Sequence, residues 1–115
     1  MCHKVLQELP MDNVQLMKGV LEGCILGIIA KGETYGYEIL VSLEKNGFED
    51  VSEGTVYPII TRLDKGRYIA CRRAKSPLGP MRKYYSITPT GEKMLEEFKA
   101  RYERITESAR KVLYE

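Results

Sequence analysis

The sequence predicts a mainly α-helical α+β fold with a small β-hairpin, arranged as a winged helix-turn-helix followed by a C-terminal dimerisation helix. Three observations predict it. Three helical segments each end at a glycine, a basic stretch then changes to the two-residue period of strands, and the C-terminal segment carries a heptad-like apolar seam. We divide the 115 residues into an N-terminal arm (1–13), the winged domain (14–88) and the C-terminal helix (89–115).

The composition indicates a soluble, cytoplasmic protein. Apolar residues make up 43% of the chain and charged residues 30%, and no apolar run reaches the roughly 18 residues of a membrane span. The three cysteines are widely spaced and no secretory signal is evident, so we expect reduced thiols. Because His3 is the single histidine, no catalytic triad or metal-ligand set is available, and we expect no enzyme, no metal and no cofactor.

Positive charge is concentrated in one segment. The net charge is +2, but residues 1–61 hold four lysines against nine acidic residues, whereas residues 62–85 hold eight Lys or Arg against Asp64. Neutralisation of phosphates supplies much of the affinity of DNA-binding proteins. A basic segment of this kind is the electrostatic footprint of a nucleic-acid-binding protein.

The first helix is predicted from about Val14 to Lys31 and is apolar nearly all round. A helix that is apolar on every side must be buried on every side. A domain of this size does not easily enclose such a helix, so we expect part of it, including Leu16 and Val20, to meet a second subunit. Gly32 ends the helix.

The second helix follows directly. Thr34 is expected to cap it, and Tyr35, Ile39 and Leu43 at i, i+4 and i+8 form its buried stripe. Gly47 closes it. A short connection then leads into a third helix, which is the layout of a helix-turn-helix unit.

The third helix, from Ser52 to Gly66, has the pattern of a recognition helix. Ser52 is expected to cap it and Gly66 to supply a left-handed stop. Its buried stripe consists of Val56, Ile59, Ile60 and Leu63. The opposite face is small, polar and basic, with Gly54, Pro58, Thr61, Arg62 and Lys65, and with Thr55 and Tyr57 on its flanks. Such a face can approach DNA closely in the major groove, whereas the alternative is an ordinary solvated helix.

A β-hairpin follows the third helix. Residues 68–75 and 81–87 read as strands, and Ser76 to Pro80 as the turn between them. Five cations belong to this hairpin: Arg72, Arg73, Lys75, Arg82 and Lys83. As the wing of a winged helix, the hairpin would place these cations on DNA phosphates. The alternative is a solvated edge hairpin whose charges prevent aggregation.

The last helix opens at Thr88, whose hydroxyl caps it, with Pro89 at the first helical position. Apolar residues then follow at spacings of three and four: Leu95, Phe98, Tyr102, Ile105, Ala109 and Val112. This is a short heptad seam, and we expect it to form a homodimer interface. Packing of the seam onto its own domain is the alternative.

Three motifs resemble the PadR family of bacterial transcriptional regulators. They are Thr34-Tyr35-Gly36-Tyr37-Glu38-Ile39, the segment from Ser52 to Leu63, and Arg82-Lys83-Tyr84-Tyr85-Ser86-Ile87-Thr88 running into Gly91. The resemblance covers about Leu16 to Leu113, and it implies a homodimeric winged-helix repressor, sometimes released from DNA by a small molecule. It places DNA contacts on the wing cations and on Ser52, Gly54, Thr55, Tyr57 and Thr61, with Tyr35 and Tyr37 near the DNA backbone.

The resemblance also raises an effector site. Some short members of the family hold flat aromatic drugs between tryptophans at the dimer centre, but this chain has no Trp. Phe98 and Tyr102 would line a smaller pocket for a small hydrophobic or aromatic effector, although their helical spacing also fits plain packing.

Two functions follow from these patterns. The first is a sequence-specific transcriptional regulator, a repressor that binds double-stranded operator DNA as a homodimer and leaves it when an effector binds. The alternative is a winged-helix module whose basic wing docks on an acidic protein without specific DNA binding. Cys71 lies beside Arg72 and Arg73, which favours a redox-sensitive thiol, but no resolving cysteine is near it in sequence, which favours a structural one.

Overall fold

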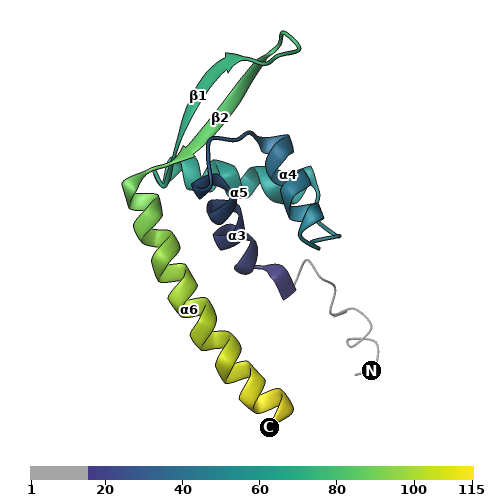
Figure 1. Cartoon of the computed structure of the whole chain (residues 1–115), viewed down its shortest axis with the longest axis vertical. Helices are drawn as coiled ribbons and strands as arrows, with labels where there is room; N and C mark the ends of the chain where they lie inside the picture. Colours follow the sequence, from purple (N-terminus) through teal and green to yellow (C-terminus); the bar gives the residue numbers. More distant parts are fainter. Residues whose placement is uncertain (1–15) are drawn as a thin grey trace, which may run out of the picture.

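The computed structural model describes residues 16–115. The elements, in chain order, are α3 (Val20–Ala30), α4 (Gly36–Lys45), α5 (Glu53–Lys65), β1 (Ile69–Lys75), β2 (Met81–Ile87) and α6 (Pro89–Tyr114). The predicted mainly helical fold with one hairpin is therefore confirmed. The predicted arm, residues 1–13, lies outside the described residues. The molecule is elongated, 54 × 31 × 25 Å, with the β1–β2 hairpin at one end and the C-terminus of α6 at the other (Figure 1).

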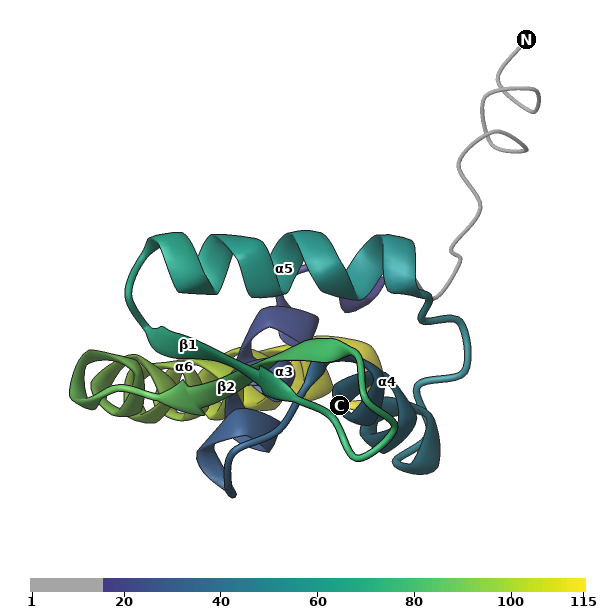
Figure 2. The same cartoon turned by 90° about the horizontal axis from the view of Figure 1, so that it is seen from above.

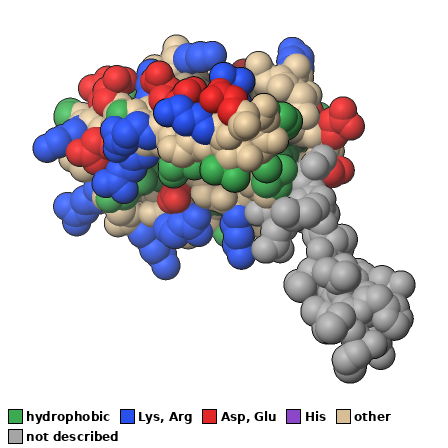
Figure 3. All heavy atoms as spheres, turned by 90° about the horizontal axis from the view of Figure 1, so that it is seen from below, with side chains coloured by type: hydrophobic (Ala, Val, Ile, Leu, Met, Phe, Trp, Pro, Cys, Tyr) green, Lys and Arg blue, Asp and Glu red, His purple; other side chains and the backbone are tan. Residues whose placement is uncertain are grey.

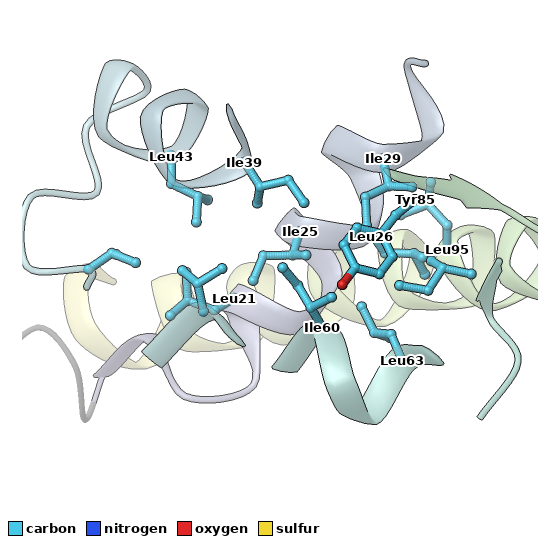
Figure 4. Packing of buried hydrophobic residues seen from close by; sticks show 13 residues of the cluster. Leu21, Ile25, Leu26, Ile29, Ile39, Leu43, Ile60, Leu63, Tyr85 and Leu95 are labelled. Atoms are coloured by element: carbon cyan, nitrogen blue, oxygen red, sulfur yellow. The ribbon is translucent and has the colours of Figure 1, made fainter. Parts of the chain in front are cut away.

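The core forms where α3, α4 and α5 meet. Ile25, Leu26 and Ile29 of α3 are almost completely buried, and α3 contacts α4, α6 and β2. Figure 4 shows Ile25 between Ile39 of α4 and Ile60 of α5, with Leu26 and Ile29 beside Tyr85 and Leu95. Burying one such aliphatic side chain stabilises the fold by about 1.5–3 kcal/mol. The core therefore fixes the position of α5 relative to the other two helices.

The first helix is shorter than predicted. Residues 16 and 17 are helical, Lys18 and Gly19 form a turn, and α3 begins only at Val20. The prediction of one helix from Val14 to Lys31 is wrong because Gly19 adopts a φ of 91°, which breaks a right-handed helix and which glycine tolerates best. Leu16 is 67% exposed, and Val20 is half-buried.

The second helix starts later than predicted. Its N-cap is Tyr35, without a side-chain cap, so the predicted cap at Thr34 is wrong. The backbone of Thr34 instead pairs with that of Tyr85, with N···O distances of 3.1 and 2.7 Å. Ile39 and Leu43 are buried as predicted, but Tyr35 is only half-buried and faces the hairpin. The start of α4 is thus attached to the hairpin.

The third helix runs between the predicted residues, but the conformation and hydrogen bonding at its two ends differ from the prediction. Ser52 is the N-cap residue, yet its hydroxyl caps no backbone N–H. Gly66 has a right-handed φ of −79°, so the predicted left-handed stop is wrong; Arg67, with a φ of 63°, takes that conformation. A Cβ on Gly66 would collide with the ring of Tyr68, and this close packing is what requires glycine there.

The hairpin and the last helix are joined tightly. The strands are antiparallel, with Ile69 opposite Ile87 and Lys75 opposite Met81, within the predicted strand ranges. Thr88 caps α6 as predicted, because its Oγ1 accepts a hydrogen bond from the N–H of Gly91 at 3.0 Å. Its hydroxyl also donates to the carbonyl of Arg67 at 2.8 Å.

The second half of α6 leaves the domain. Leu95 is buried against α3, and Phe98 is half-buried, but every residue from Lys99 onward is exposed. The view from above in Figure 2 shows α6 running below the hairpin, with α5 to one side of it. None of the helices within residues 16–115 combines the length and apolar content that crossing a bilayer requires.

Candidate nucleic-acid interface

The outward face of α5 is open. Val56, Ile60 and Leu63 turn into the core, so the opposite side of the helix is left for contacts outside the chain. Residues predicted to lie on that side are exposed: Gly54, Pro58, Thr61, Arg62 and Lys65, with Ser52 at the helix start and Thr55 half-buried on one flank. Gly54 has only the Ser52 hydroxyl near its missing Cβ, so another molecule can approach the backbone there.

A groove of about 600 Å³ runs between the start of α4, the face of α5 and the hairpin. Its lining consists of Tyr35, Gly36, Tyr37, Tyr57, Thr61, Leu78, Arg82, Lys83 and Tyr85. Six of these were predicted as DNA contacts from the sequence: Tyr35, Tyr37, Tyr57, Thr61, Arg82 and Lys83. The fold therefore brings together residues that lie almost fifty positions apart in the chain.

Sequence reasoning missed three residues of the groove: Gly36, Leu78 and Tyr85, the last of which is largely buried in the core. Gly36 lies under the ring of Tyr57, so closely that a Cβ on Gly36 would overlap the ring. The glycine in the Tyr-Gly-Tyr motif was the available signal. Leu78, in the turn of the hairpin, is 86% exposed, and a single apolar residue in a loop gave no signal.

Arginines and tyrosines interleave on one side of the hairpin. The guanidinium of Arg82 lies 3.8 Å from the centre of the Tyr35 ring and 5.9 Å from that of Tyr84. The Tyr35 and Tyr84 rings meet edge to face at 5.9 Å. Cation–π contacts of this kind are worth about 0.5–1 kcal/mol at exposed sites. They hold Arg82 in place at the wall of the groove.

Arg72 is paired within the chain. Its Nε and Nη2 donate to the two carboxylate oxygens of Glu33 at 2.6 and 2.8 Å, and its guanidinium lies 5.0 Å from the Tyr84 ring centre. The hydrogen bond from Arg72, together with its positive charge, lowers the pKa of Glu33 from its ordinary value. No short pattern indicated this pair, because 39 positions separate the two residues.

The remaining predicted cations differ in their surroundings. Arg62 donates to Glu22 of α3 at 3.4 Å, a pair with both side chains partly exposed. Arg73 and Lys75 are exposed on β1, and Lys65 is exposed near the end of α5. Cys71 is also exposed on β1, whereas burial raises the pKa of the half-buried Cys24 thiol.

Six of the predicted dimerisation residues lie on α6, whereas Leu16 and Val20 lie before and at the start of α3, and Leu95 is buried in the core of its own domain. The Phe98 and Tyr102 rings stack at 5.9 Å, and Phe98 covers Gly23 so closely that any side chain there would collide. Beyond this stack the seam is uncovered within residues 16–115: Tyr102 is 44% exposed, Ile105 67% and Val112 83%, and Ala109 is also exposed. Figure 3 shows hydrophobic side chains at the surface of this end, bordered by charges of both signs.

The sequence of the domain matches a known family. Residues 25–97 match the Transcriptional regulator PadR-like family, a span that includes α4, α5, the hairpin and the start of α6. The chain belongs to this family. PadR-like proteins are transcriptional regulators and not enzymes, and the predicted resemblance is confirmed.

Solved structures of PadR-like proteins share the fold. The chain is similar to a PadR-like transcriptional regulator from Bacillus cereus strain ATCC 14579, with 46% identity, a TM-score of 0.78, and coverage of 88% of this chain and 98% of that one. It is also similar to Bacillus subtilis PadR solved in complex with operator DNA, with 27% identity and a TM-score of 0.62 over 69% of this chain and 46% of that one. These matches confirm the predicted winged-helix class.

A curated relative carries a functional name. The negative transcriptional regulator PadR of Bacillus subtilis (strain 168) is 28% identical over 93 residues, which cover 79% of this chain and 51% of the relative. This PadR-like chain therefore spans about half the length of that relative.

Proposed function

We propose that this PadR-like chain is a sequence-specific transcriptional repressor that binds operator DNA as a homodimer. The observation that carries the proposal is the groove, where the small outward face of α5 and the cations Arg82 and Lys83 converge. A helix with a small polar face enters the major groove, and flanking cations neutralise phosphates. The solved complex of Bacillus subtilis PadR with operator DNA supports this assignment.

Base contacts in this proposal come from α5. Gly54 permits close approach, while Tyr57 and Thr61 present polar groups and Arg62 and Lys65 present donors. Ser52 and Thr55 at the helix start add donors near the phosphates. Their exposure, or half-exposure for Thr55, supports these roles.

Contacts to the DNA backbone come from the hairpin and from α4. Arg73, Lys75, Arg82 and Lys83 neutralise phosphates. Tyr35 and Tyr37 donate phenolic hydroxyls to the backbone from the start of α4, where both line the groove.

Dimerisation in this proposal uses the uncovered seam of α6. Tyr102, Ile105 and Val112 are large apolar residues left at the surface, and their heptad spacing fits a helical partner. Leu16 is a further exposed apolar side chain, and Val20 lies half-buried near it in sequence. Two recognition helices held by a dimer read two half-sites about one helical turn of DNA apart.

Repression and release by an effector complete the proposal. The name of the Bacillus subtilis relative, a negative regulator, supports repression. A small hydrophobic or aromatic effector would bind at the dimer centre beside the stacked Phe98 and Tyr102 rings. A separate hollow of about 530 Å³ is lined in part by Cys24, Leu95 and Lys99, the last of which follows Phe98 in the chain.

The test is fluorescence anisotropy of the purified protein with its own upstream intergenic DNA and with a scrambled duplex, across a salt series. The proposal expects tight, salt-sensitive binding that prefers the upstream DNA. Equal affinity for both duplexes would remove sequence specificity. Absence of binding to either duplex would overturn the proposal in favour of a module that docks on an acidic protein.

A further inference from the structure

An unbroken series of contacts joins Glu33, in the segment before α4, to both strands of the wing, β1 and β2. The carboxylate of Glu33 accepts two hydrogen bonds from Arg72 of β1. The Arg72 guanidinium lies over Tyr84 of β2, and Arg82 lies over both Tyr84 and Tyr35. The series therefore ends at Arg82 and Tyr35, which line the groove.

The register of the strands explains this arrangement. Arg72 is opposite Tyr84, and Ala74 is opposite Arg82, so the three large side chains share one face of the hairpin. Arg73 and Lys83 form the next pair and point to the other face. The lining of the groove includes Arg82 and Lys83 but neither Arg72 nor Glu33. The Arg72 charge is therefore directed at a carboxylate of its own chain.

A two-stranded hairpin needs such an attachment. An isolated two-stranded hairpin is marginally stable in water at best. The wing is attached to the segment before α4 at two adjacent points: the backbone bridge between Thr34 and Tyr85, and the Glu33–Arg72 pair. A guanidinium bonded to both oxygens of a carboxylate fixes orientation as well as distance.

We infer that Glu33 is a positioning residue for DNA binding, which orients the wing through Arg72 and Tyr84 so that Arg82 faces the phosphates. The inference rests on the proposed DNA-binding function. Ordering the wing before DNA arrives lowers the entropic cost of binding. Arg72 then acts as a tether of the wing, and the phosphate contacts belong to its neighbours.

Whether operator affinity rises or falls when the Glu33 charge is removed distinguishes simple electrostatic repulsion from a positioning role. Simple electrostatics expects an acidic side chain beside a DNA-binding surface to repel phosphates, so its removal would tighten binding. If Glu33 positions the wing, the opposite is expected, because Glu33→Gln loosens the wing and weakens DNA binding. The expected loss of affinity is about threefold, which is the size expected for an exposed ion pair. The two views cannot both hold for the same variant.

The experiment is a double-mutant cycle on operator affinity, measured by anisotropy across a salt series. We expect Glu33→Gln and Arg72→Ala each to weaken binding about threefold, and the double variant to be no weaker than either single one. The slope of log affinity against log salt stays unchanged, because no phosphate contact is lost. Glu44→Gln, which removes an exposed acid from the far end of α4, is the matched control and leaves affinity unchanged.

A second measurement needs no DNA. Hydrogen exchange of the β1 and β2 amides in the free protein should be faster in Glu33→Gln than in the parent and the Glu44→Gln control. Equal or tighter DNA binding by Glu33→Gln, or unchanged exchange in the wing, would overturn the inference. A fall of about 0.9 in the salt slope of Arg72→Ala would assign Arg72 to a phosphate instead. A parent protein that binds no operator would overturn the proposed function, and the exchange result would still decide whether the tether exists.

Discussion

The two ends of the molecule differ in whether their surface side chains are held by other residues of the same chain. At the wing end, arginines and tyrosines are held by other residues of the same chain, as with Arg82 over Tyr35 and Arg72 on Glu33. At the far end of α6, apolar residues such as Ile105 and Val112 are exposed and have no neighbours among residues 16–115 that bury them. The side chains of the wing end are held within a single chain, whereas the apolar side chains of the α6 end are left exposed, as the proposed homodimer requires.

The two ends therefore differ in the main source of their binding free energy, which is a low entropic cost of ordering at the wing and the hydrophobic effect at α6. Polar and cationic groups that already hold their orientation lose little entropy when a ligand arrives, so the wing end favours specific contacts. An apolar seam gains most of its free energy when water leaves it, and this requires association. Substitutions at the two ends should therefore affect different measurements.

The largest effect is expected at the α6 end. Tyr102→Glu places a charge in the proposed dimer seam, and a two-fold interface contains the substitution twice. Losing about 1.5 kcal/mol or more for each side chain raises the dimer dissociation constant at least about a hundredfold. Sedimentation velocity measures the shift to monomers. Lys111→Glu, on the exposed polar surface of the same helix, is the control and should stay dimeric.

A Tyr102→Glu protein that remained dimeric would remove the seam from the dimer model. A monomeric variant that bound operator as tightly as the parent would instead separate dimerisation from DNA binding. Either result would show that the far end of α6 does not support DNA binding through dimerisation.

A smaller effect is expected from Gly36→Ala at the wing end. The new methyl group would overlap the Tyr57 ring, which must then swing out of its place in the groove. We expect operator affinity to fall about tenfold, as one good base contact is worth about 1–3 kcal/mol. Thermal unfolding should change little, because Tyr57 is exposed.

Gly27→Ala is the matched control for this substitution. A Cβ on Gly27 would meet Leu95 at an ordinary 3.9 Å, away from the groove. Anisotropy and thermal melts on both variants make the measurement. Unchanged operator affinity in Gly36→Ala would show that the placement of Tyr57 does not matter for DNA.

The contribution of Lys83 should appear in the salt dependence. Lys83→Ala removes one proposed phosphate contact, so the slope of log affinity against log salt should become shallower by about 0.9. The loss should be similar for operator and scrambled DNA, because phosphate contacts carry no sequence information. Lys45→Ala, at the end of α4 and outside the groove, should keep the parent slope. A parent-like slope in Lys83→Ala would place its charge away from the DNA.

The smallest effect concerns the titration of Glu33. Arg72 lowers the pKa of this carboxyl, so the ion pair favours the folded wing at pH values above the ordinary Glu pKa of about 4.3. That contribution disappears as pH falls through the lowered pKa. An NMR titration of the Glu33 carboxyl carbon should show a midpoint below the ordinary value in the parent and near it in Arg72→Ala. Lys31 and Glu38 line the same depression as Glu33, and their charges act on both proteins alike.

Local patterns predicted most of the fold. The period of α5, the alternation of β1 and β2, and the Thr88-Pro89 start of α6 each depend on neighbouring residues, and each was found where predicted. The ends of the helices were harder to predict from the sequence. The apolar run through Gly19 resembled one continuous helix, and the left-handed residue after α5 is Arg67 where glycine was expected.

Distant contacts explain the rest of the differences. Tyr35 has the spacing of a buried helix residue, but its ring packs against Tyr84 and Arg82 of the hairpin. The pairs Arg62–Glu22 and Arg72–Glu33 join residues 40 and 39 positions apart. No short pattern carries such information. Six groove residues were predicted, from the motifs, the outward face of the third helix or the cluster of wing cations, whereas Glu33 carried none of these signals.

The hydrogen bonds of Thr88 fix the start of α6 to the base of the wing, so the direction of the whole helix depends on this junction. The hydroxyl of Thr88 bonds to the carbonyl of Arg67, at the base of the wing, and the backbone N–H of Thr88 donates to the carbonyl of Tyr68. The 26 residues of α6 form an arm of about 39 Å at ~1.5 Å per residue, so a tilt of about 5° at one end displaces the other by about 3 Å. In the proposed dimer, where the far ends of two α6 helices are held together, a tilt of this size would move the wing by about the length of a hydrogen bond.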